Sequence, residues 1–104
     1  MIRGGVYEVD LGSAPRGHEQ RGRRRGLVIS PSDSALSVST IVPTSTRAQS
    51  SINRPEIIVQ GKLTRFLTDQ TRVIDNNYIG EMVDFLSRDD MAEVEHALSR
   101  YFGI

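Results

Sequence analysis

The sequence contains no cysteine and no tryptophan, and only two of its 104 residues are histidine. Without cysteine the chain forms no disulfide and offers no thiolate to a metal ion. The histidines, His18 and His96, lack the spacing of an H-E-x-x-H zinc motif, so we expect neither a dedicated metal site nor another cofactor. Any chemistry that the protein performs should therefore be free of metal.

Long apolar runs are also missing. No stretch approaches the ~18 apolar residues that a membrane-spanning helix needs, and the N-terminus enters a strand-like pattern without the apolar segment of a secretion signal. We therefore expect a cytoplasmic protein that makes no contact with a membrane. The length predicts a single domain, residues 1–104, large enough to fold around its own core.

The whole chain has no net charge, but its two halves have opposite net charges. Thirteen Lys and Arg residues balance thirteen Asp and Glu residues. Residues 1–54 nevertheless hold eight basic and four acidic residues, whereas residues 55–104 hold five and nine. This asymmetry indicates one basic face suited to a polyanion and one acidic face, although the acidity is also typical of a solvated helix.

Most of the positive charge lies in one short segment. Residues 16–25 contain five arginines and a single acid, Glu19, and immediately precede the apolar run 26–29. Because like charges repel and the guanidinium fork matches phosphate, this segment is predicted to be a phosphate-binding loop. A solvated surface loop is the alternative. Glu19 and His18 would add proton transfer to the charge.

The middle of the chain has the patterns of short strands. Alternating or β-branched runs predict strands over 6–11, 26–29, 38–42, 56–60, 63–67 and 71–74, with a long loop between the first two and a two-residue turn at 61–62. The six aromatic residues mostly fall on core-like positions, so recognition should rely on hydrogen bonds and charge rather than on stacking.

Only the end of the chain changes period. Met91, Val94, Leu98 and Tyr101 recur at helical spacing, Ser87 is placed to cap the start, and Gly103 can end the helix. We predict one amphipathic helix over 88–102, with His96 on its solvent side. The fold class is therefore mainly β (α+β): an SH3-like barrel or strongly bent antiparallel sheet with a C-terminal helix.

Four segments in a fixed order carry a family resemblance, namely residues 4–11, 17–24 leading into 27–30, 42–46 and 69–74. In this order they resemble the MazF/PemK toxins of bacterial toxin–antitoxin systems, and the match spans nearly the whole chain. His18, Arg25 and Ser45 stand where the family usually has Ser, Pro and Thr. Serine keeps the hydroxyl, whereas the loss of proline removes a rigid element after Arg24.

The resemblance implies an endoribonuclease that cuts single-stranded RNA without a metal and leaves a 2′,3′-cyclic phosphate and a 5′-hydroxyl. It selects Arg24 as the cation that stabilises the phosphorane, with Ser45 contacting the same phosphate. For Ser45, a turn hydroxyl bonded to its own backbone is the alternative. Glu19 is the candidate general base or, alternatively, a salt-bridge partner that orders the loop.

Further residues are candidates for contacting RNA through base edges, phosphates or stacking: His18, Gln20, Arg21, Arg23, Arg25, Thr44, Thr46, Gln70 and Arg72. The family further implies a homodimer with its RNA groove along the interface, and a cognate antitoxin whose acidic, extended segment competes for that groove. Two alternatives stay open: a non-catalytic toxin of the same fold that binds a protein such as DNA gyrase, and an RNA-binding module that does not cleave.

Overall fold

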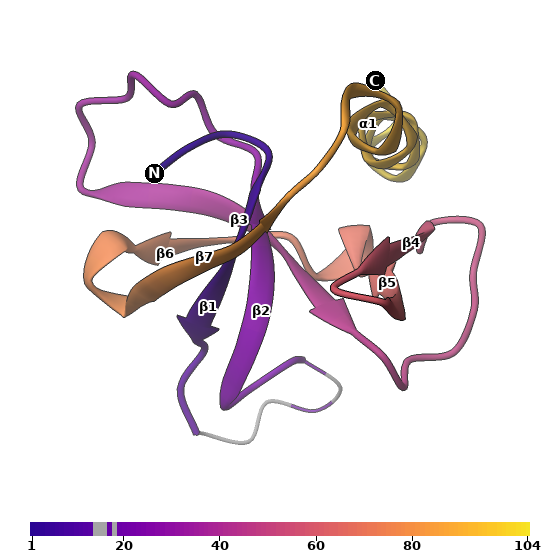
Figure 1. Ribbon diagram of the computed structural model, residues 1–104, viewed down its shortest axis with the longest axis horizontal. Helices are drawn as coiled ribbons and strands as arrows, with labels where there is room; N and C mark the ends of the chain where they lie inside the picture. Colours follow the sequence, from indigo (N-terminus) through magenta and orange to yellow (C-terminus); the bar gives the residue numbers. More distant parts are fainter. Residues whose placement is uncertain (14–16, 18) are drawn as a thin grey trace.

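The protein is described by a computed structural model, drawn in Figure 1, which covers residues 1–13, 17 and 19–104. Its elements are β1 (Gly5–Asp10), β2 (Arg23–Val28), β3 (Val38–Ser45), β4 (Glu56–Val59), β5 (Lys62–Phe66), the 3-10 helix η1 (Thr68–Gln70), β6 (Arg72–Asp75), the 3-10 helix η2 (Asn76–Tyr78), β7 (Ile79–Phe85) and α1 (Arg88–Phe102).

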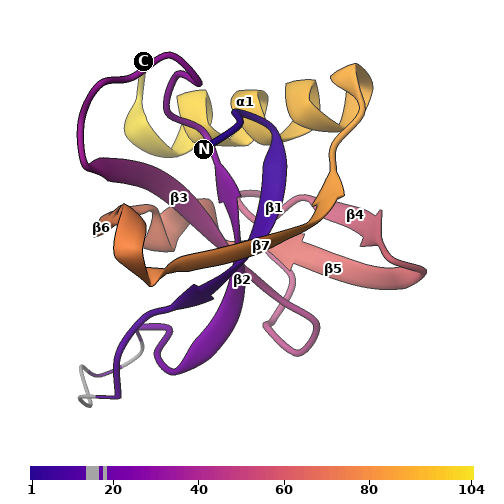
Figure 2. The same cartoon turned by 60° about the vertical axis from the view of Figure 1, so that its left-hand side comes forward.

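The strands form one strongly curled antiparallel sheet. Its order is β4-β5-β3-β2-β1-β7, and β6 pairs with the first half of β3 while the end of β3 pairs with β5. Figures 1 and 2 show α1 on one side of the curled sheet, with the end of β1 and the beginning of β2 at the far end of the sheet from it. The predicted fold class is therefore confirmed.

The central strands are buried on both faces because the curled sheet encloses two cores. Val6 and Leu27 pack beneath α1 with Met91 and Val94. Their chain neighbours, Tyr7 and Val28, point the other way and pack with Ile41, Ile74 and Ile79. The alternation expected for a half-buried first strand therefore holds at Glu8 and Asp10, which are exposed, but fails at Val6, which is fully buried.

Each of the six predicted strands differs from the observed strand at one end or both, and three of these differences matter for the fold. β2 begins at Arg23 rather than residue 26, because Arg23–Arg25 pair with β1. β3 continues through Pro43 to Ser45, since the backbone of Thr44 and Ser45 pairs with β5. The hairpin turn is Gln60-Gly61, one residue earlier than expected, and both residues have the positive φ that a tight two-residue turn requires. β7 was not predicted at all.

The C-terminal helix has the predicted bounds and caps. The backbone N–H of Asp90 donates to the Ser87 hydroxyl, and Gly103 ends the helix in the left-handed conformation. Ala97 takes the buried position that was expected for Leu98 and Tyr101, which are half-buried and exposed, and His96 is exposed as predicted. Among the described residues, no helix is both long and apolar enough to cross a membrane.

The aromatic side chains were wrongly placed in the core. Tyr7 and Phe66 are buried, but Tyr78, Phe85, Tyr101 and Phe102 are each between 44 and 57% exposed. They lie on β7, on η2 and at the end of α1. Aromatic stacking with a ligand is therefore available on this protein.

Candidate functional site

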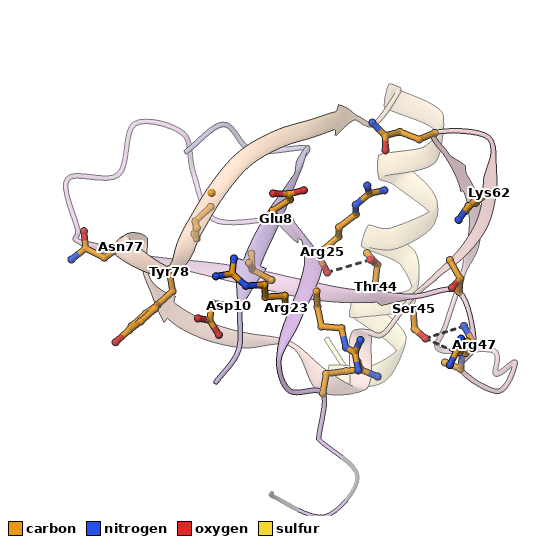
Figure 3. A pocket seen from close by; sticks show the side chains of 18 residues that line it. Glu8, Asp10, Arg23, Arg25, Thr44, Ser45, Arg47, Lys62, Asn77 and Tyr78 are labelled. Atoms are coloured by element: carbon orange, nitrogen blue, oxygen red, sulfur yellow. Dashed lines mark hydrogen bonds between the residues drawn. The ribbon is translucent and has the colours of Figure 1, made fainter. Parts of the chain in front are cut away.

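A broad open groove of about 1260 Å³ runs across the ends of β1 and β2 and is bounded by the segment after β3, the β4–β5 turn and η2 (Figure 3). Seven of the residues that the sequence singled out line it: Gln20, Arg23, Arg24, Arg25, Thr44, Ser45 and Thr46. The groove thus brings together residues of the basic segment and of the 44–46 corner, which the family resemblance had assigned to one phosphate.

The groove is strongly cationic. Arg23, Arg24, Arg25, Arg47 and Lys62 all line it, against the two carboxylates Glu8 and Asp10. The ion pairs among the described residues all lie elsewhere, at Arg3–Glu95, Arg54–Asp69 and Arg65–Glu56. Five positive charges therefore line one groove, and none of them forms an ion pair with another described residue, which favours a polyanionic ligand.

Three of these arginines stand on a strand rather than in a loop. In the register of β1 and β2, Asp10 pairs with Arg23, Val9 with Arg24, and Glu8 with Arg25. Arg24 therefore points to the opposite face of the strand from its two neighbours. Gly26, next along the strand, packs against Ile41 so tightly that an added Cβ would lie 3.1 Å from its Cδ1. The sheet thus fixes the backbone positions from which the three arginine side chains extend.

Ser45 ends β3 and shapes the turn after it. Its Oγ accepts hydrogen bonds from the backbone N–H groups of Arg47, at 3.1 Å, and Ala48, at 3.0 Å (Figure 3). The lone pairs of the Ser45 hydroxyl are therefore used in the turn, as the alternative interpretation of this residue expected. Because a hydroxyl accepts with its oxygen and donates with its hydrogen, the O–H remains available to a ligand in the groove.

The neighbours of Ser45 differ in their exposure. Thr44 is buried, and its hydroxyl donates to the backbone carbonyl oxygen of Arg25 at 3.2 Å. It thereby joins β3 to β2 and fixes the backbone that carries Arg25. Thr46 is exposed and lines the groove with its hydroxyl unengaged by any other described residue.

Two predicted RNA contacts hold the basic segment in place. The Gln70 Oε1 accepts from the backbone N–H of Gln20 at 2.6 Å, and Arg72 Nη1 donates to the Gln20 carbonyl oxygen at 3.5 Å. Neither Gln70 nor Arg72 lines the groove. Both therefore contact the backbone of Gln20, which lines the groove, without lining it themselves.

The remaining predicted residues lie outside the groove or outside the described residues. Glu19 and Arg21 are exposed on either side of Gln20 and do not line the groove. His18 lies outside the described residues, as does Arg16. Within the part of the chain that the structure describes, no three His, Asp or Glu side chains gather where a metal ion could be held.

Several groove residues were missed by sequence reasoning: Glu8, Asp10, Arg47, Lys62, Asn77 and Tyr78. The polar phase of β1 carried a usable signal for Glu8 and Asp10, because residues two apart on a strand share a face. Arg47 and Lys62 come from connections whose approach to β2 depends on the curl of the sheet. Tyr78, which is 57% exposed, was not singled out because most aromatic residues were expected at core-like positions.

A partly buried ion pair supports the segment after β3, which carries Arg47. Arg54 Nε and Nη2 donate to the two Asp69 carboxylate oxygens at 3.0 and 2.8 Å, and Arg54 Nη1 also donates to the Gln49 carbonyl oxygen. The hydrogen bonds from Arg54, opposed in part by burial, lower the pKa of Asp69, and Asp69 in turn raises the pKa of Arg54. This pair ties the segment after β3 to η1.

Known proteins are similar to this chain in both sequence and fold. The family described as PemK-like, MazF-like toxin of type II toxin–antitoxin systems matches residues 2–102. A Mycobacterium tuberculosis (strain H37Rv) protein named "Putative toxin Rv3098A" is 58% identical over 105 residues, covering 100% of this chain and 99% of that protein.

Among solved structures, MazF from Deinococcus radiodurans superposes with a TM-score of 0.86 at 25% identity, covering 100% of this chain and 97% of that one. An endoribonuclease from a mycobacterial species, solved with its cognate antitoxin, has a TM-score of 0.82 at 17% identity, covering 100% and 96%. The second likeness concerns the fold alone. On the family match and the toxin relative, the chain belongs to the PemK/MazF-like toxins of type II toxin–antitoxin systems.

Proposed function

We propose that the protein is a metal-independent endoribonuclease toxin that cleaves single-stranded RNA at selected sequences. The observation that carries the proposal is the groove, which is lined both by Ser45 and by five cations that form no ion pair with another described residue. Membership of the toxin family supports the same activity, and two proteins of this fold are named as endoribonucleases. In the proposed reaction the 2′-hydroxyl oxygen attacks the adjacent phosphorus, the bond to the 5′-oxygen breaks, and the products carry a 2′,3′-cyclic phosphate and a 5′-hydroxyl.

Arg24 is the proposed catalytic cation. Its backbone is fixed in the ladder between β1 and β2, while its side chain is exposed and unpaired within the described residues. A guanidinium held in this way can donate two hydrogen bonds to the non-bridging oxygens as charge develops on the phosphorane. The preorganised backbone means that little rearrangement is needed at the moment of reaction.

Ser45 is proposed to donate its hydroxyl hydrogen to the same phosphate. Two backbone N–H groups already occupy its lone pairs, at 3.1 and 3.0 Å, and these bonds both fix the oxygen and polarise the O–H bond. The same bonds leave the oxygen unsuited to act as a base or nucleophile. Ser45 is therefore assigned to charge stabilisation beside Arg24.

Glu19 remains the proposed proton acceptor for the 2′-hydroxyl. It is exposed next to Gln20, which does line the groove, and Gln70 and Arg72 hold Gln20 by its backbone. A single RNA strand bound in the groove would thus pass close to the Glu19 carboxylate. The two carboxylates that do line the groove, Glu8 and Asp10, instead have arginines directly opposite them on β2.

The proposed partners follow from the charge of the groove and from the family. A cognate antitoxin would neutralise the toxin by laying an acidic, extended segment into the cationic groove, and a fold neighbour is solved with its cognate antitoxin. We also propose a homodimer that acts in the cytoplasm. In such a dimer the RNA strand would continue from one groove toward that of the second copy.

The proposed activity is tested with purified protein and mixed total RNA in the presence of EDTA, followed by analysis of the fragment ends. We expect fragments with 2′,3′-cyclic phosphate and 5′-hydroxyl ends. Intact RNA under all conditions would contradict the nuclease and favour a toxin that acts on a protein, whereas cleavage abolished by EDTA would contradict the metal-free mechanism.

The role of Arg24 is tested by Arg24→Ala. We expect cleavage to fall by about 100- to 1000-fold, as when one preorganised oxyanion contact is lost, with no change in thermal stability because the side chain is exposed. Arg88→Ala, at an exposed position at the start of α1 and outside the groove, is the matched control and should retain activity. Full activity of Arg24→Ala would remove Arg24 from the mechanism.

A further inference from the structure

A carboxylate in the middle of a phosphate-binding groove requires an explanation. Glu8 is exposed on β1 and lines the groove together with five cations. It makes no ion pair with any other described residue, although Arg25 lies directly opposite it on β2. A carboxylate repels phosphate, so a bound RNA strand must present hydrogen-bond donors to Glu8 rather than its backbone. In RNA such donors are found on the base edges and at the 2′-hydroxyl.

The residues around Glu8 leave its carboxylate accessible and hold the neighbouring backbone in place. Gly80 on β7 lies beside it, and a Cβ added there would be 3.6 Å from the Glu8 Cβ, so the absence of a side chain at this position leaves the carboxylate uncovered. On the other side, the Thr44 hydroxyl holds the Arg25 carbonyl oxygen at 3.2 Å. Asp10, the next acid on the same face, differs because its Oδ1 accepts from the Gly12 N–H.

Glu8 and Arg25 present a defined sequence of hydrogen-bonding groups. Directly opposed residues on antiparallel strands have Cβ atoms about 5 Å apart and project from the same face. Figure 3 shows the Glu8 carboxylate and the Arg25 guanidinium extending side by side from neighbouring strands. Arginine only donates and an ionised carboxylate only accepts, so the pair offers one donor followed by two acceptors.

From this arrangement we infer that Glu8 and Arg25 read a guanine base in the cleaved RNA motif, an inference that rests on the proposed nuclease function. The Watson–Crick edge of guanine carries the O6 acceptor followed by the N1–H and N2–H₂ donors, which complements the pair at all three positions. Uracil places its O2 acceptor against the second carboxylate oxygen, and cytosine and adenine each place an acceptor ring nitrogen against the first. Unstacked bases in single strands are read along this edge.

The inference predicts a base requirement that can be altered. Wild-type cleavage sites, mapped by sequencing fragment ends from mixed RNA, should share a guanosine at one fixed position. Replacing this guanosine by inosine, which lacks the N2 amino group, should lower kcat/KM by roughly tenfold, the effect of one hydrogen bond to a charged group. A cleavage motif without any fixed guanosine would overturn the inference while leaving the nuclease proposal intact.

Glu8→Gln provides the sharper test. The amide keeps one acceptor and replaces the other by a donor, so with Arg25 it offers donor, acceptor, donor, which complements the O4, N3–H and O2 of uracil. We expect the preferred base at that position to change from guanine to uracil, with kcat/KM on the original substrate about 100-fold lower. Glu81→Gln, on β7 and outside the groove, is the matched control and should keep the guanine preference.

Other outcomes decide the matter as well. An unchanged motif in Glu8→Gln, with an unchanged thermal midpoint, would overturn the role of Glu8. If wild-type protein does not cut RNA, the nuclease proposal fails, and the inference is then judged by fluorescence anisotropy with short single-stranded oligonucleotides. Tighter binding of a guanosine-containing oligonucleotide than of its inosine counterpart, lost in Glu8→Gln, would support base reading, and equal binding would overturn it.

Discussion

Asp69→Asn should destabilise the protein by weakening the contact between η1 and the segment after β3, which borders the groove, rather than by disturbing the core. The carboxylate receives two hydrogen bonds from Arg54, at 3.0 and 2.8 Å, and the side chains of Arg54 and Asp69 are 21 and 28% exposed. A solvent-exposed ion pair stabilises by at most about 1 kcal/mol, whereas a hydrogen bond to a charged group in the interior contributes about 1.5–3 kcal/mol. The partial exposure and the acceptor that asparagine retains place the expected loss near 1 kcal/mol.

The pH dependence of this loss has a definite sign. Arg54 lowers the pKa of Asp69 in the folded state, so the carboxylate stabilises the fold at pH values above the ordinary aspartate pKa of about 3.9. As the pH falls through the lower pKa of the folded protein, Asp69 becomes protonated in both states and the stabilisation disappears. The gap between wild type and Asp69→Asn should therefore be full at pH 7 and close in strong acid.

Urea denaturation of both proteins between pH 7 and pH 3 measures this gap. At pH 7 the loss corresponds to a thermal midpoint lower by about 4–8 °C for a domain of this size. Asp33→Asn is the control, because Asp33 is exposed and forms no ion pair with other described residues. A gap that stays constant down to pH 3, or no gap at pH 7, would refute the assignment of the stabilisation to the Arg54–Asp69 pair.

Two further predictions concern the groove. Gln70→Ala should lower cleavage by roughly tenfold, because the bond that holds the Gln20 backbone at 2.6 Å is lost, and a drop in thermal midpoint without loss of activity would contradict this positioning role. If all five groove cations contact phosphates, RNA affinity measured by anisotropy should fall by about 100-fold between 50 and 200 mM salt; a salt-independent affinity would show that they do not.

The helix was predictable because its signals are local. Ser87, Gly103 and the apolar spacing around Met91 and Val94 all lie within or beside the segment that they define. Capping and helical amphipathicity depend on neighbours within about one turn, so a single sequence contains the information. The error at Tyr101, which is exposed, arose because Ala97 rather than the end of the apolar spacing takes the last buried position of the helix.

The strands were less predictable because their burial is set by distant segments. A half-buried strand alternates, but Val6 and Tyr7 are both buried since each faces a different core. β7 was missed because its burial pattern shows no alternation, and its pairing with β1 is interrupted by two register shifts. The start of β2 was missed because three consecutive arginines do not resemble a strand until β1 is placed beside them.

The candidate site illustrates the same division. The family resemblance assigned Arg24 and Ser45 to one phosphate site, and both residues line the groove. The sequence and the resemblance did not supply Arg47, Lys62 or Glu8, whose presence in the groove depends on how far the sheet curls. The sequence thus shows the chemical type of each residue. Which residues line the groove could be known only once the register of β1 against β2 was established.

Ser45 shows why the structure changes the chemical argument rather than only its location. From sequence, a phosphate contact and a turn hydroxyl bonded to its own backbone stood as alternatives. In the structure the Oγ accepts from Arg47 and Ala48, so the turn role uses the lone pairs. The hydrogen is not used in these bonds, so the hydroxyl can still donate it to a third group. The two roles are therefore compatible, and the turn is what aims the proposed phosphate donor.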